Sequence, residues 1–504
     1  MGKNRIHFSL LTAVFGATAM ILSSCASVYF SFVPFRDYQI DNDNHQTITA
    51  EGYYKPGDYS PYTFLNDNSE EESFVDFTDV YRHQDFFRSI RSLGRQKLLV
   101  IPVDFEDYPS SNLPEGTEGS LEVLRNAFFG VNENNHWRSV AGFYNESSYG
   151  KLILDGKVTN WYRSPRLASD IRPLTSKTNI VREIYNGALT WYQETHGDLA
   201  SYYVDGDSSQ PVPVYFVYSH PSETGQGARD KMFWAFTINR APTLACWSSY
   251  SLTYLTDGRP DTHTYIHEVG HLFGLEDYYN TGGEIYGPTG RADMMDYSIG
   301  DHTGYSKMLL DWARPYVVTN TTEITIRPFY SSGDLILIKN DWNGTAMDEY
   351  LLLEYYSPNG LNAHDSRTNT SNPQLMQHAG IKVYHVDSRL AFLTDDPFSR
   401  VLGYVEDGVN SKDETRIGIV HTNTNIGDNK TYNNNRLYHL LESSGENTFI
   451  NGGVATNDTL FKAGDSFGIN TFNDFVFNSG DELGYTFTIS QITNTFAKIS
   501  INKI

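Results

Sequence analysis

Short apolar runs and stretches of helical periodicity alternate through the first half of the chain. The runs at residues 97–105 ("KLLVIPVDF") and 212–220 ("VPVYFVYSH") are short, β-branched and apolar, which is typical of buried strands. Residues 151–162 ("KLILDGKVTNWY") predict two strands joined by an Asp-Gly turn, because Asp-Gly is a favoured hairpin sequence. This half of the chain therefore contributes at least four predicted strands to one folding unit.

Three segments of the same half predict helices. Residues 120–130 predict a helix with Ser120 as its N-cap and Gly130 at its end. Residues 176–195 carry apolar side chains near helical spacing. The third helix follows the last strand and carries the stretch "TYIHEVGHLFGLEDYYN" at residues 264–280. Strands and helices in this order predict a mixed sheet with helices packed on it.

After Trp312 the pattern changes to short alternating runs separated by Gly, Asn and Asp, which is the signature of antiparallel β structure. These runs lie at residues 322–330, 334–340, 349–356, 380–387, 485–492 and 497–504. The Asn-rich stretch at residues 421–435 predicts a long surface loop. The expected fold class is therefore α+β, with a mixed-sheet domain followed by an antiparallel β-rich region that we expect to be β-sandwich-like.

The N-terminus has the layout of a secretory signal, because Lys3 and Arg5 precede an apolar stretch that ends near residue 22. The sequence "LSSC", which ends at Cys25, resembles a bacterial lipobox, in which the cysteine is lipidated. An ordinary signal peptide with an incidental cysteine is the alternative. Residues 26–92 are polar and acidic and predict a tether or pro-segment. Lipid on Cys25 would anchor the protein to the extracellular face of the bacterial cell membrane, whereas an unmodified Cys25 predicts a secreted protein.

The 504-residue chain has a formal charge of −23, from 61 acidic and 38 basic residues. Such a surface repels phosphate backbones, so we do not expect nucleic-acid binding. Some of the carboxylates could hold a structural calcium ion (Ca²⁺), which prefers oxygen ligands. Cys246 is the only cysteine besides Cys25, and we expect it to be a small buried residue because the sequence around it contains no activating base.

His267 and His271 lie four residues apart on the third predicted helix, so their side chains project from one face with Cβ atoms roughly 5–6 Å apart. Two imidazole nitrogens at that spacing suit a zinc ion (Zn²⁺). Glu268 lies on the adjacent flank of the helix, where its carboxylate can reach a water molecule and serve as a general base. A bare H-E-x-x-H sequence also arises by coincidence, so a third ligand is needed.

The residues after the helix offer that ligand. Gly274 follows His271 by three residues, where a helix can end in a left-handed turn that glycine tolerates best. The chain can then fold back and present Asp277, whose carboxylate completes the pattern H-E-x-x-H-x-x-G-x-x-D. Glu276 is the competing ligand, but it lies one residue closer to Gly274.

Residues 291–312 resemble the region that follows the active-site helix in the metzincin peptidases. Those enzymes place a methionine-containing turn beneath the zinc site, and Met295 is the matching methionine in this chain. Tyr297 completes a Met-x-Tyr arrangement similar to that of astacin- and serralysin-type enzymes, whose tyrosine can bind the metal or stabilise the tetrahedral intermediate. A packed core tyrosine is the alternative, because the chain contains 35 tyrosines.

The chain as a whole resembles the immune inhibitor A family of secreted bacterial zinc metallopeptidases, over roughly residue 97 to the C-terminus. The matching segments are, in order, "LLVIPVDFED", "VAGFYNESSYGKLILDGKVTNWY", "TYIHEVGHLFGLEDYY", "YSKMLLDW", "YLLLEYYSPNGLN", "GIKVYHVD" and "TLFKAGDSF". The chain departs from the family at Glu276, where proline is usual. The resemblance implies a metzincin-like catalytic domain, a removable pro-segment and, in some members, bound calcium.

These observations predict an extracellular, membrane-tethered zinc endopeptidase that hydrolyses peptide bonds of protein or peptide substrates. The expected parts are a lipoprotein-type signal peptide at 1–25, a tether or pro-segment at 26–92, a catalytic domain at 93–318 and a β-rich region at 319–504. The main alternative is a surface-exposed binding protein or adhesin on an inactive or latent peptidase scaffold. The presence of Glu268 argues against it, because an inactive scaffold has no need of the base. The sequence does not indicate an oligomeric state.

Overall fold

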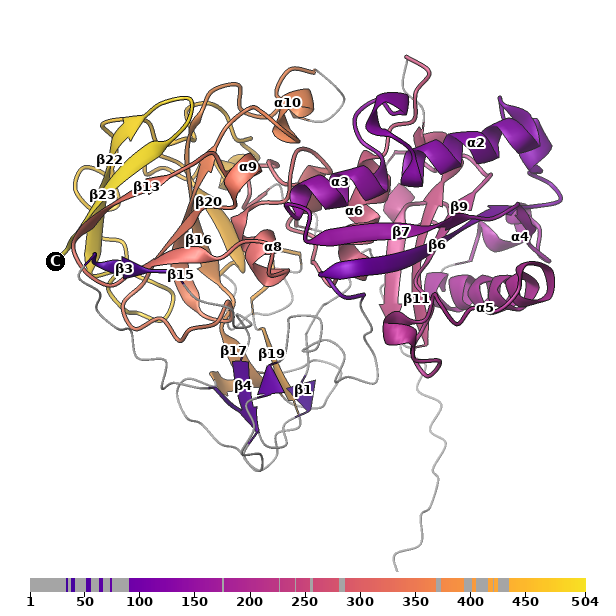
Figure 1. Cartoon of the computed structure of the whole chain (residues 1–504), viewed down its shortest axis with the longest axis horizontal. Helices are drawn as coiled ribbons and strands as arrows, with labels where there is room; N and C mark the ends of the chain where they lie inside the picture. The colour runs from indigo at the N-terminus through magenta and orange to yellow at the C-terminus, as the bar shows by residue number, and fades with distance from the viewer. Residues whose placement is uncertain are drawn as a thin grey trace, which may run out of the picture.

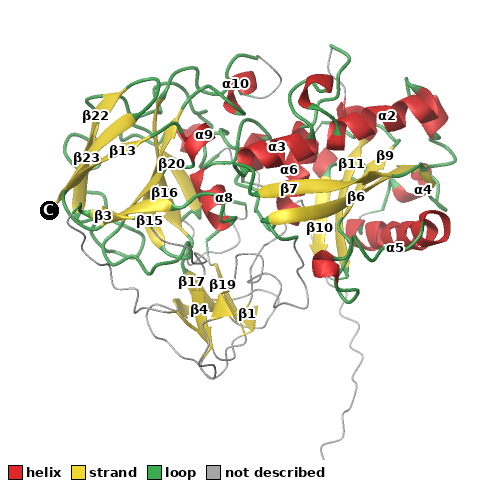
Figure 2. Ribbon diagram, viewed as in Figure 1, coloured by secondary structure: helices red, strands yellow, loops and turns green. Residues whose placement is uncertain are grey.

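The computed structural model describes residues 33–34, 38–40, 51–55, 63–66, 73–74, 90–174, 176–225, 227–240, 242–253, 257–280, 286–368, 373–393, 401–404, 416–419, 421–424 and 435–504. The predicted signal peptide, Cys25 and most of the predicted tether lie outside these residues, as does most of the Asn-rich loop predicted at 421–435. The chain is a mixed α+β protein with several sheets, in agreement with the expected fold class (Figure 2).

The first part of the chain is built on a six-stranded sheet with the order β10-β11-β9-β6-β7, in which β8 also pairs with β6. Its strands are β6 (Gly94–Asp104), β7 (Leu152–Val158), β8 (Tyr162–Arg163), β9 (Val214–Tyr218), β10 (Phe236–Arg240) and β11 (Thr243–Ser249). All neighbouring strands are parallel except β10, which runs antiparallel to β11. The sheet is therefore mixed, and β6 and β9 coincide with the two runs predicted as buried strands.

Helices cover both faces of this sheet (Figure 1). The helices on one face are α2 (Gly116–Phe129), α3 (Val140–Ser147) and α6 (His263–Leu272); those on the other are α4 (Ala168–Ile171) and α5 (Lys177–His196). Leu98 and Val100 of β6 join the hydrophobic cluster on the first face, and Leu99 and Ile101 join the cluster on the second. Because side chains alternate along a strand, a sheet covered on both faces needs consecutive apolar residues, which explains the unbroken apolar run.

The second part of the chain contains a six-stranded sheet of order β20-β16-β15-β14-β12-β3 and a four-stranded sheet of order β13-β23-β22-β21. Their strands are β3 (Tyr53–Tyr54), β12 (Pro315–Val318), β13 (Thr322–Ile326), β14 (Leu335–Ile338), β15 (Glu349–Tyr356), β16 (Gly380–Asp387), β20 (Tyr438–Leu441), β21 (Ser466–Phe467), β22 (Tyr485–Ile492) and β23 (Ala497–Lys503). Only β12 and β14 pair in parallel. One hydrophobic cluster includes Ile336 and Leu351 of the first sheet and Phe487 and Ile499 of the second, so the two sheets pack face to face.

Two small sheets, four short α-helices and several 3-10 helices complete the described structure. The sheet strands are β1 (Val33–Pro34), β19 (Arg416–Ile419), β17 (Leu390–Leu393) and β18 (Val401–Tyr404), and β2 (Tyr38–Ile40), β4 (Thr63–Asn66) and β5 (Ser73–Phe74). The helices are α7 (Met294–Tyr297), α8 (Gly304–Leu309), α9 (Phe329–Ser332) and α10 (Asn362–Asp365).

One continuous core joins the two parts. The cluster that contains Ile266 and Val269 of α6 also contains Leu352, Tyr384 and Tyr438 of the larger C-terminal sheet. That sheet therefore uses one face against the four-stranded sheet and the other against the α6 side of the molecule. The predicted domain boundaries stay predictions.

Two local predictions in the first half are wrong. Ser120 lies inside α2, which begins at Gly116, and its hydroxyl donates to the carbonyl of Thr117 at 2.9 Å instead of capping the helix. The Asp-Gly pair at Asp155 and Gly156 lies within the single strand β7 and does not form a turn. Parallel pairing with β6 continues through it, with Gly156 opposite Leu98, and so overrides the local turn preference.

The neighbouring strand β6 lies so close to position 156 that a side chain there would clash with it, so glycine is needed. A Cβ atom at this position would lie 1.9 Å from the carbonyl oxygen of Leu98 and 2.7 Å from the ring of Phe129. We expect Gly156→Ala to lower the free energy of unfolding by about 1–3 kcal/mol, as overpacked core positions do, in urea denaturation followed by fluorescence. Gly287→Ala is the matched control, because its Cβ would meet no atom closer than 3.8 Å. Equal unfolding free energies for the two variants would contradict this interpretation of the strand pairing.

Candidate metal centre

The helix α6 is held against the sheet by its apolar side chains. Tyr265, Ile266 and Val269 belong to the hydrophobic cluster on that face of the sheet. His267 and His271 project together from the same helix, as their four-residue spacing requires, and are only 6% and 5% exposed. The helix therefore presents two imidazoles to a buried site.

The end of α6 turns the chain back toward these histidines. The backbone NH of Gly274 donates to the carbonyl of His271 at 3.0 Å, and that of Leu275 donates to the carbonyl of Gly270 at 3.2 Å. This pair of bonds is a Schellman motif, which needs a residue of positive φ, and Gly274 has φ +92°. The predicted role of Gly274 is thus confirmed, and the turn brings Asp277 back to the helix.

His267, His271 and Asp277 converge on one point. An oxygen of Asp277 lies 3.0 Å from Nε2 of His267 and 3.2 Å from Nε2 of His271. In a tetrahedral zinc shell with bonds of about 2.0–2.1 Å, neighbouring ligand atoms lie roughly 3.3 Å apart. The two measured distances are slightly shorter, so small movements would seat a zinc ion among these three groups.

The other ring nitrogens of the two histidines are bound to carbonyl groups. Nδ1 of His267 lies 2.8 Å from the carbonyl oxygen of Met294, and Nδ1 of His271 lies 2.8 Å from that of Leu275. A carbonyl oxygen can only accept, so both Nδ1 atoms carry hydrogen, and a neutral ring then has its lone pair on Nε2. Metal-binding histidines are oriented in this way, and the donor set therefore fits zinc.

Glu268 lies beside this group and is held by a residue of β10. Its carboxylate accepts a hydrogen bond of 2.7 Å from the hydroxyl of Thr237. Burial raises the pKa of Glu268 above its ordinary value. A buried carboxylate with a raised pKa is suited to accept and return a proton near neutral pH. Sequence reasoning missed Thr237, because no local signal connects it to a helix 31 residues away.

Glu276, the competing ligand, points away from the histidines. Its carboxylate accepts a hydrogen bond of 3.2 Å from the hydroxyl of Thr422, and burial raises the pKa of Glu276 well above its usual range. The structure therefore favours Asp277 as the third ligand, because Asp277 alone of this pair contacts His267 and His271.

Met295 lies directly beneath α6. A Cβ atom on Gly270, between the two histidines in the helix, would lie 2.5 Å from the sulfur of Met295. The backbone NH of Met295 donates to the carboxylate of Asp293, the N-cap of α7, at 2.7 Å. The short helix α7 thus packs against α6 between the two histidines, and the role of Met295 as a methionine turn stays a prediction.

Tyr297 ends α7, and its ring lies 4.8 Å from the guanidinium carbon of Arg291. The predicted role of Tyr297 at the metal stays a prediction. Cys246 is fully buried, and burial raises the pKa of its thiol well above the usual value, which does not suit a nucleophile.

One sequence of the type that surrounds the nucleophile of serine hydrolases occurs in the chain, and its surroundings do not suit that role. The sequence at 464–468 matches G-x-S-x-G, but its Ser466 lies buried in β21, which pairs with the antiparallel β22. The nucleophile of a serine hydrolase with this motif stands exposed on a turn between a strand and a helix.

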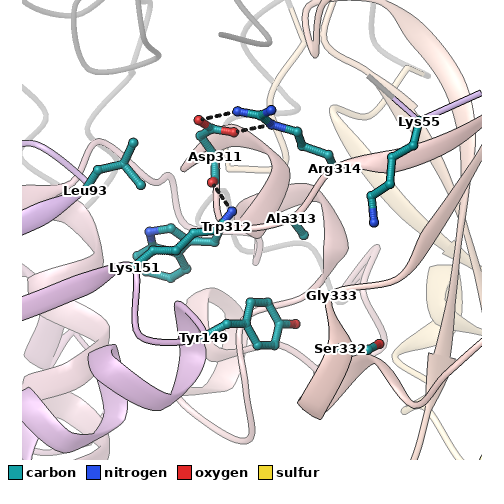
Figure 3. A pocket seen from close by; sticks show the side chains of 10 residues that line it. All are labelled: Lys55, Leu93, Tyr149, Lys151, Asp311, Trp312, Ala313, Arg314, Ser332 and Gly333. Carbon is teal, nitrogen blue, oxygen red and sulfur yellow. Dashed lines mark hydrogen bonds and ion pairs between the residues drawn. The ribbon is translucent and has the colours of Figure 1, made fainter. Parts of the chain in front are cut away.

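A pocket of about 570 Å³ lies at another place, where the first and second parts of the chain meet (Figure 3). Its lining residues are Lys55, Leu93, Tyr149, Lys151, Asp311, Trp312, Ala313, Arg314, Ser332 and Gly333. Arg314 pairs with the carboxylate of Asp311 at 3.0 Å, and Lys151 donates to the carbonyl of Asp311 at 2.9 Å. One of the three basic side chains of this pocket is thus paired with its one carboxylate, and the lining includes none of the predicted site residues.

The described residues support neither the predicted calcium site nor a helix that crosses a membrane. The two groups of three side chains that could hold a metal ion there both contain histidine, whereas calcium prefers oxygen ligands. No helix in the described part of the chain has the length and hydropathy needed to cross a membrane. The lipid on Cys25 stays a prediction.

Comparisons with known proteins do not identify a family. No protein-family model and no curated protein matches the chain. Wild-type OgpA from Akkermansia muciniphila is similar in two crystal forms, at 15% and 14% identity, with TM-scores of 0.27 and 0.25. The matches cover 59% and 63% of this chain and 86% and 82% of OgpA. These TM-scores are too low to carry an argument, and membership of the immune inhibitor A family stays a prediction.

The geometry predicts how zinc affinity depends on pH. Burial lowers the pKa of His267, but the hydrogen bond and charge of Asp277 outweigh it and raise the pKa to about 9. In the metal-free protein a proton therefore competes with zinc for His267 at every pH below about 9. We expect the apparent zinc affinity to rise about tenfold per pH unit between pH 6.5 and 8.5, because one proton is displaced.

Competition with a chromophoric chelator measures this affinity at each pH. Asp277→Asn is the comparison variant, since it removes both a ligand and the charge that holds the proton. It should bind zinc more weakly and with a flatter dependence on pH. Equal zinc affinity of the unaltered protein at pH 6.5 and 8.5 would contradict the expected competition.

Proposed function

We propose that this chain is a zinc-dependent endopeptidase of the metzincin type, related to the immune inhibitor A family, which hydrolyses peptide bonds of protein substrates. The observation that carries the proposal is the contact of the Asp277 carboxylate with His267 at 3.0 Å and with His271 at 3.2 Å, beside a buried Glu268. Metal ligands alone would also suit a structural site. The added glutamate, which is not one of the converging ligands, favours catalysis.

Each residue of the site has a separate task. When bound, zinc lowers the pKa of a water molecule and polarises a carbonyl group. Glu268 accepts a proton from the attacking water and returns it to the nitrogen of the leaving amine, which balances the hydrolysis of the peptide bond. Thr237 holds the Glu268 carboxylate in place at 2.7 Å. The carbonyl groups of Met294 and Leu275 keep both imidazoles oriented with Nε2 toward the site.

The position of β10 favours an extended peptide as the substrate. Among the described strands β10 is the outer strand of its sheet and pairs only with β11. Thr237 and Asn239 of β10 both contact α6, at the carboxylate of Glu268 and at the carbonyl of His271. A peptide added to the outer edge of β10 as a further strand would therefore lie close to the catalytic group.

The proposed place of action is outside the cell, at the membrane surface. The basic and apolar N-terminus supports export, and Cys25 in the lipobox-like sequence supports attachment by lipid. Protein or peptide substrates would then be cleaved at the extracellular face of the cell membrane. Release of the same chain without lipid gives a secreted enzyme.

The proposal predicts different effects for Glu268 and His271. We expect Glu268→Ala to keep zinc and lose at least about 10²-fold in casein hydrolysis, because the general base is gone. We expect His271→Ala to lose both zinc and activity, because a ligand is gone. Activity is measured as peptide release and zinc by elemental analysis of the same preparation. A Glu268→Ala protein as active as the parent would contradict the proposed mechanism.

Thr237 provides a second test, as a positioning residue. Its hydrogen bond lowers the pKa of Glu268, so its removal should raise that pKa further and move the acid limb of the pH–activity profile to higher pH. We expect Thr237→Val to lower kcat roughly tenfold at pH 7 with zinc retained.

Thr237→Ser is the matched control, because it keeps the hydroxyl and should keep the profile of the parent. A Thr237→Val enzyme whose acid limb does not move would show that Thr237 has only a packing role. KM should change little, since the Thr237 side chain contacts Glu268, whereas the peptide would pair with the backbone of β10.

A further inference from the structure

A second group of histidine and carboxylate side chains lies at the other end of α6. His263 is the first residue of α6, and α10 brings His364 and Asp365 to it from the second part of the chain. The Asp365 carboxylate lies 3.2 Å from Nε2 of His263 and 3.9 Å from Nε2 of His364. One donor atom of each residue lies within 4.8 Å of the others, in the same His-His-Asp composition as the first centre.

His263 is oriented as metal-binding histidines are, and His364 offers a nitrogen without a hydrogen-bond partner among the described residues. Nδ1 of His263 is bound to the carboxylate of Asp261 at 2.5 Å, which turns Nε2 toward Asp365. Nε2 of His364 is buried and has no hydrogen-bond partner among the described residues. A buried nitrogen without a partner is costly unless a ligand completes it.

The surroundings of the group are closed by aromatic rings and a third histidine. The ring of Trp137 stacks on His263, with centroids 4.2 Å apart and an interplanar angle of 10°. His136 stands beside His364, with centroids 4.7 Å apart, and its Nδ1 is bound to the carboxylate of Asp257 at 2.5 Å. Nε2 of His136 is likewise buried with no partner in the described part of the chain.

The group is also suited to hold a positive charge. The carboxylates of Asp365 and Asp261 contact the two ring nitrogens of His263, at 3.2 Å and 2.5 Å. A proton on His263 would satisfy these two carboxylates. It would leave the lone pair on Nε2 of His364 unused, whereas a metal cation would engage His263, His364 and Asp365 together.

We propose that His263, His364 and Asp365 form a second binding site for a zinc-class transition metal, separate from the candidate catalytic centre. His263 precedes His267 by four positions, which is roughly 6 Å along the axis of α6, so the two groups draw on successive turns of one helix. A metal here joins the start of α6 to α10 of the second part of the chain, and so fixes the helix that carries the catalytic residues. The inference does not depend on the proposed function.

Counting metal ions in matched variants tests this site. The full chain is stripped with a chelator, reloaded with zinc alone, desalted and measured by elemental analysis. We expect two zinc ions per chain in the parent, one in His364→Ala, one in His271→Ala and none in the double variant. His378→Ala, at an exposed position, is the control and should hold two.

Asp365→Asn is a second variant in case His364→Ala does not fold. The amide oxygen can still accept the 2.6 Å hydrogen bond from the backbone of Gly300, while the charge is lost. It too should hold one zinc ion. Zinc should raise the melting temperature of His271→Ala and leave that of the double variant unchanged.

The outcomes separate this site from the proposed function. A parent with one zinc ion that is lost in His271→Ala and kept in His364→Ala would overturn the second site and leave the peptidase proposal intact. A parent with one zinc ion that is kept in His271→Ala and lost in His364→Ala would support the second site and remove the catalytic one. Two zinc ions in both the parent and folded His364→Ala would overturn the second site.

Discussion

The carboxylate of Asp277 lies almost fully buried between the Nε2 atoms of His267 and His271. A carboxylate in such a place is stable only with positive charge beside it, whether a proton on an imidazole or a bound cation. The surrounding structure keeps these three side chains together. The Schellman turn at Gly274 returns the chain, and the carbonyl groups of Met294 and Leu275 hold the rings. The buried Asp277 carboxylate therefore needs a positive charge at this point, from a proton or from a bound cation.

The second part of the chain contributes directly to this arrangement. The side chain of Asn423 donates to the carbonyl of Tyr278 at 3.3 Å, and the ring of Tyr438 lies 5.1 Å from that of Tyr278. Tyr278, which follows Asp277, is therefore packed against Tyr438 of β20 and against Asn423. Removal of the β-rich region would expose the inner side of the loop that presents Asp277. The β-rich region thus packs against the loop that presents Asp277.

Glu268 and Asp277 show how one environment gives two carboxylates different properties. Both carboxylates are buried, and burial by itself would raise the pKa of each. For Asp277 the two histidines outweigh burial and hold the pKa below its usual range, which suits a permanent ligand. For Glu268 burial prevails and the pKa is raised, which suits a group that exchanges protons. The opposite pKa shifts of the proposed ligand and the proposed base therefore follow from which carboxylate the imidazoles contact.

The amino-acid sequence alone determined the features that depend on short-range order. The four-residue spacing placed His267 and His271 on one face of α6, and the runs at 349–356 and 380–387 became β15 and β16. Tertiary structure decided the rest, because packing between distant segments outweighs local preference. Parallel pairing with β6 outweighed the turn preference at Gly156. Glu276 accepts a hydrogen bond from Thr422 and does not contact the histidines as Asp277 does. Thr237 reaches Glu268 across 31 residues and Asp365 reaches His263 across 102, separations at which no periodic pattern in the chain carries information.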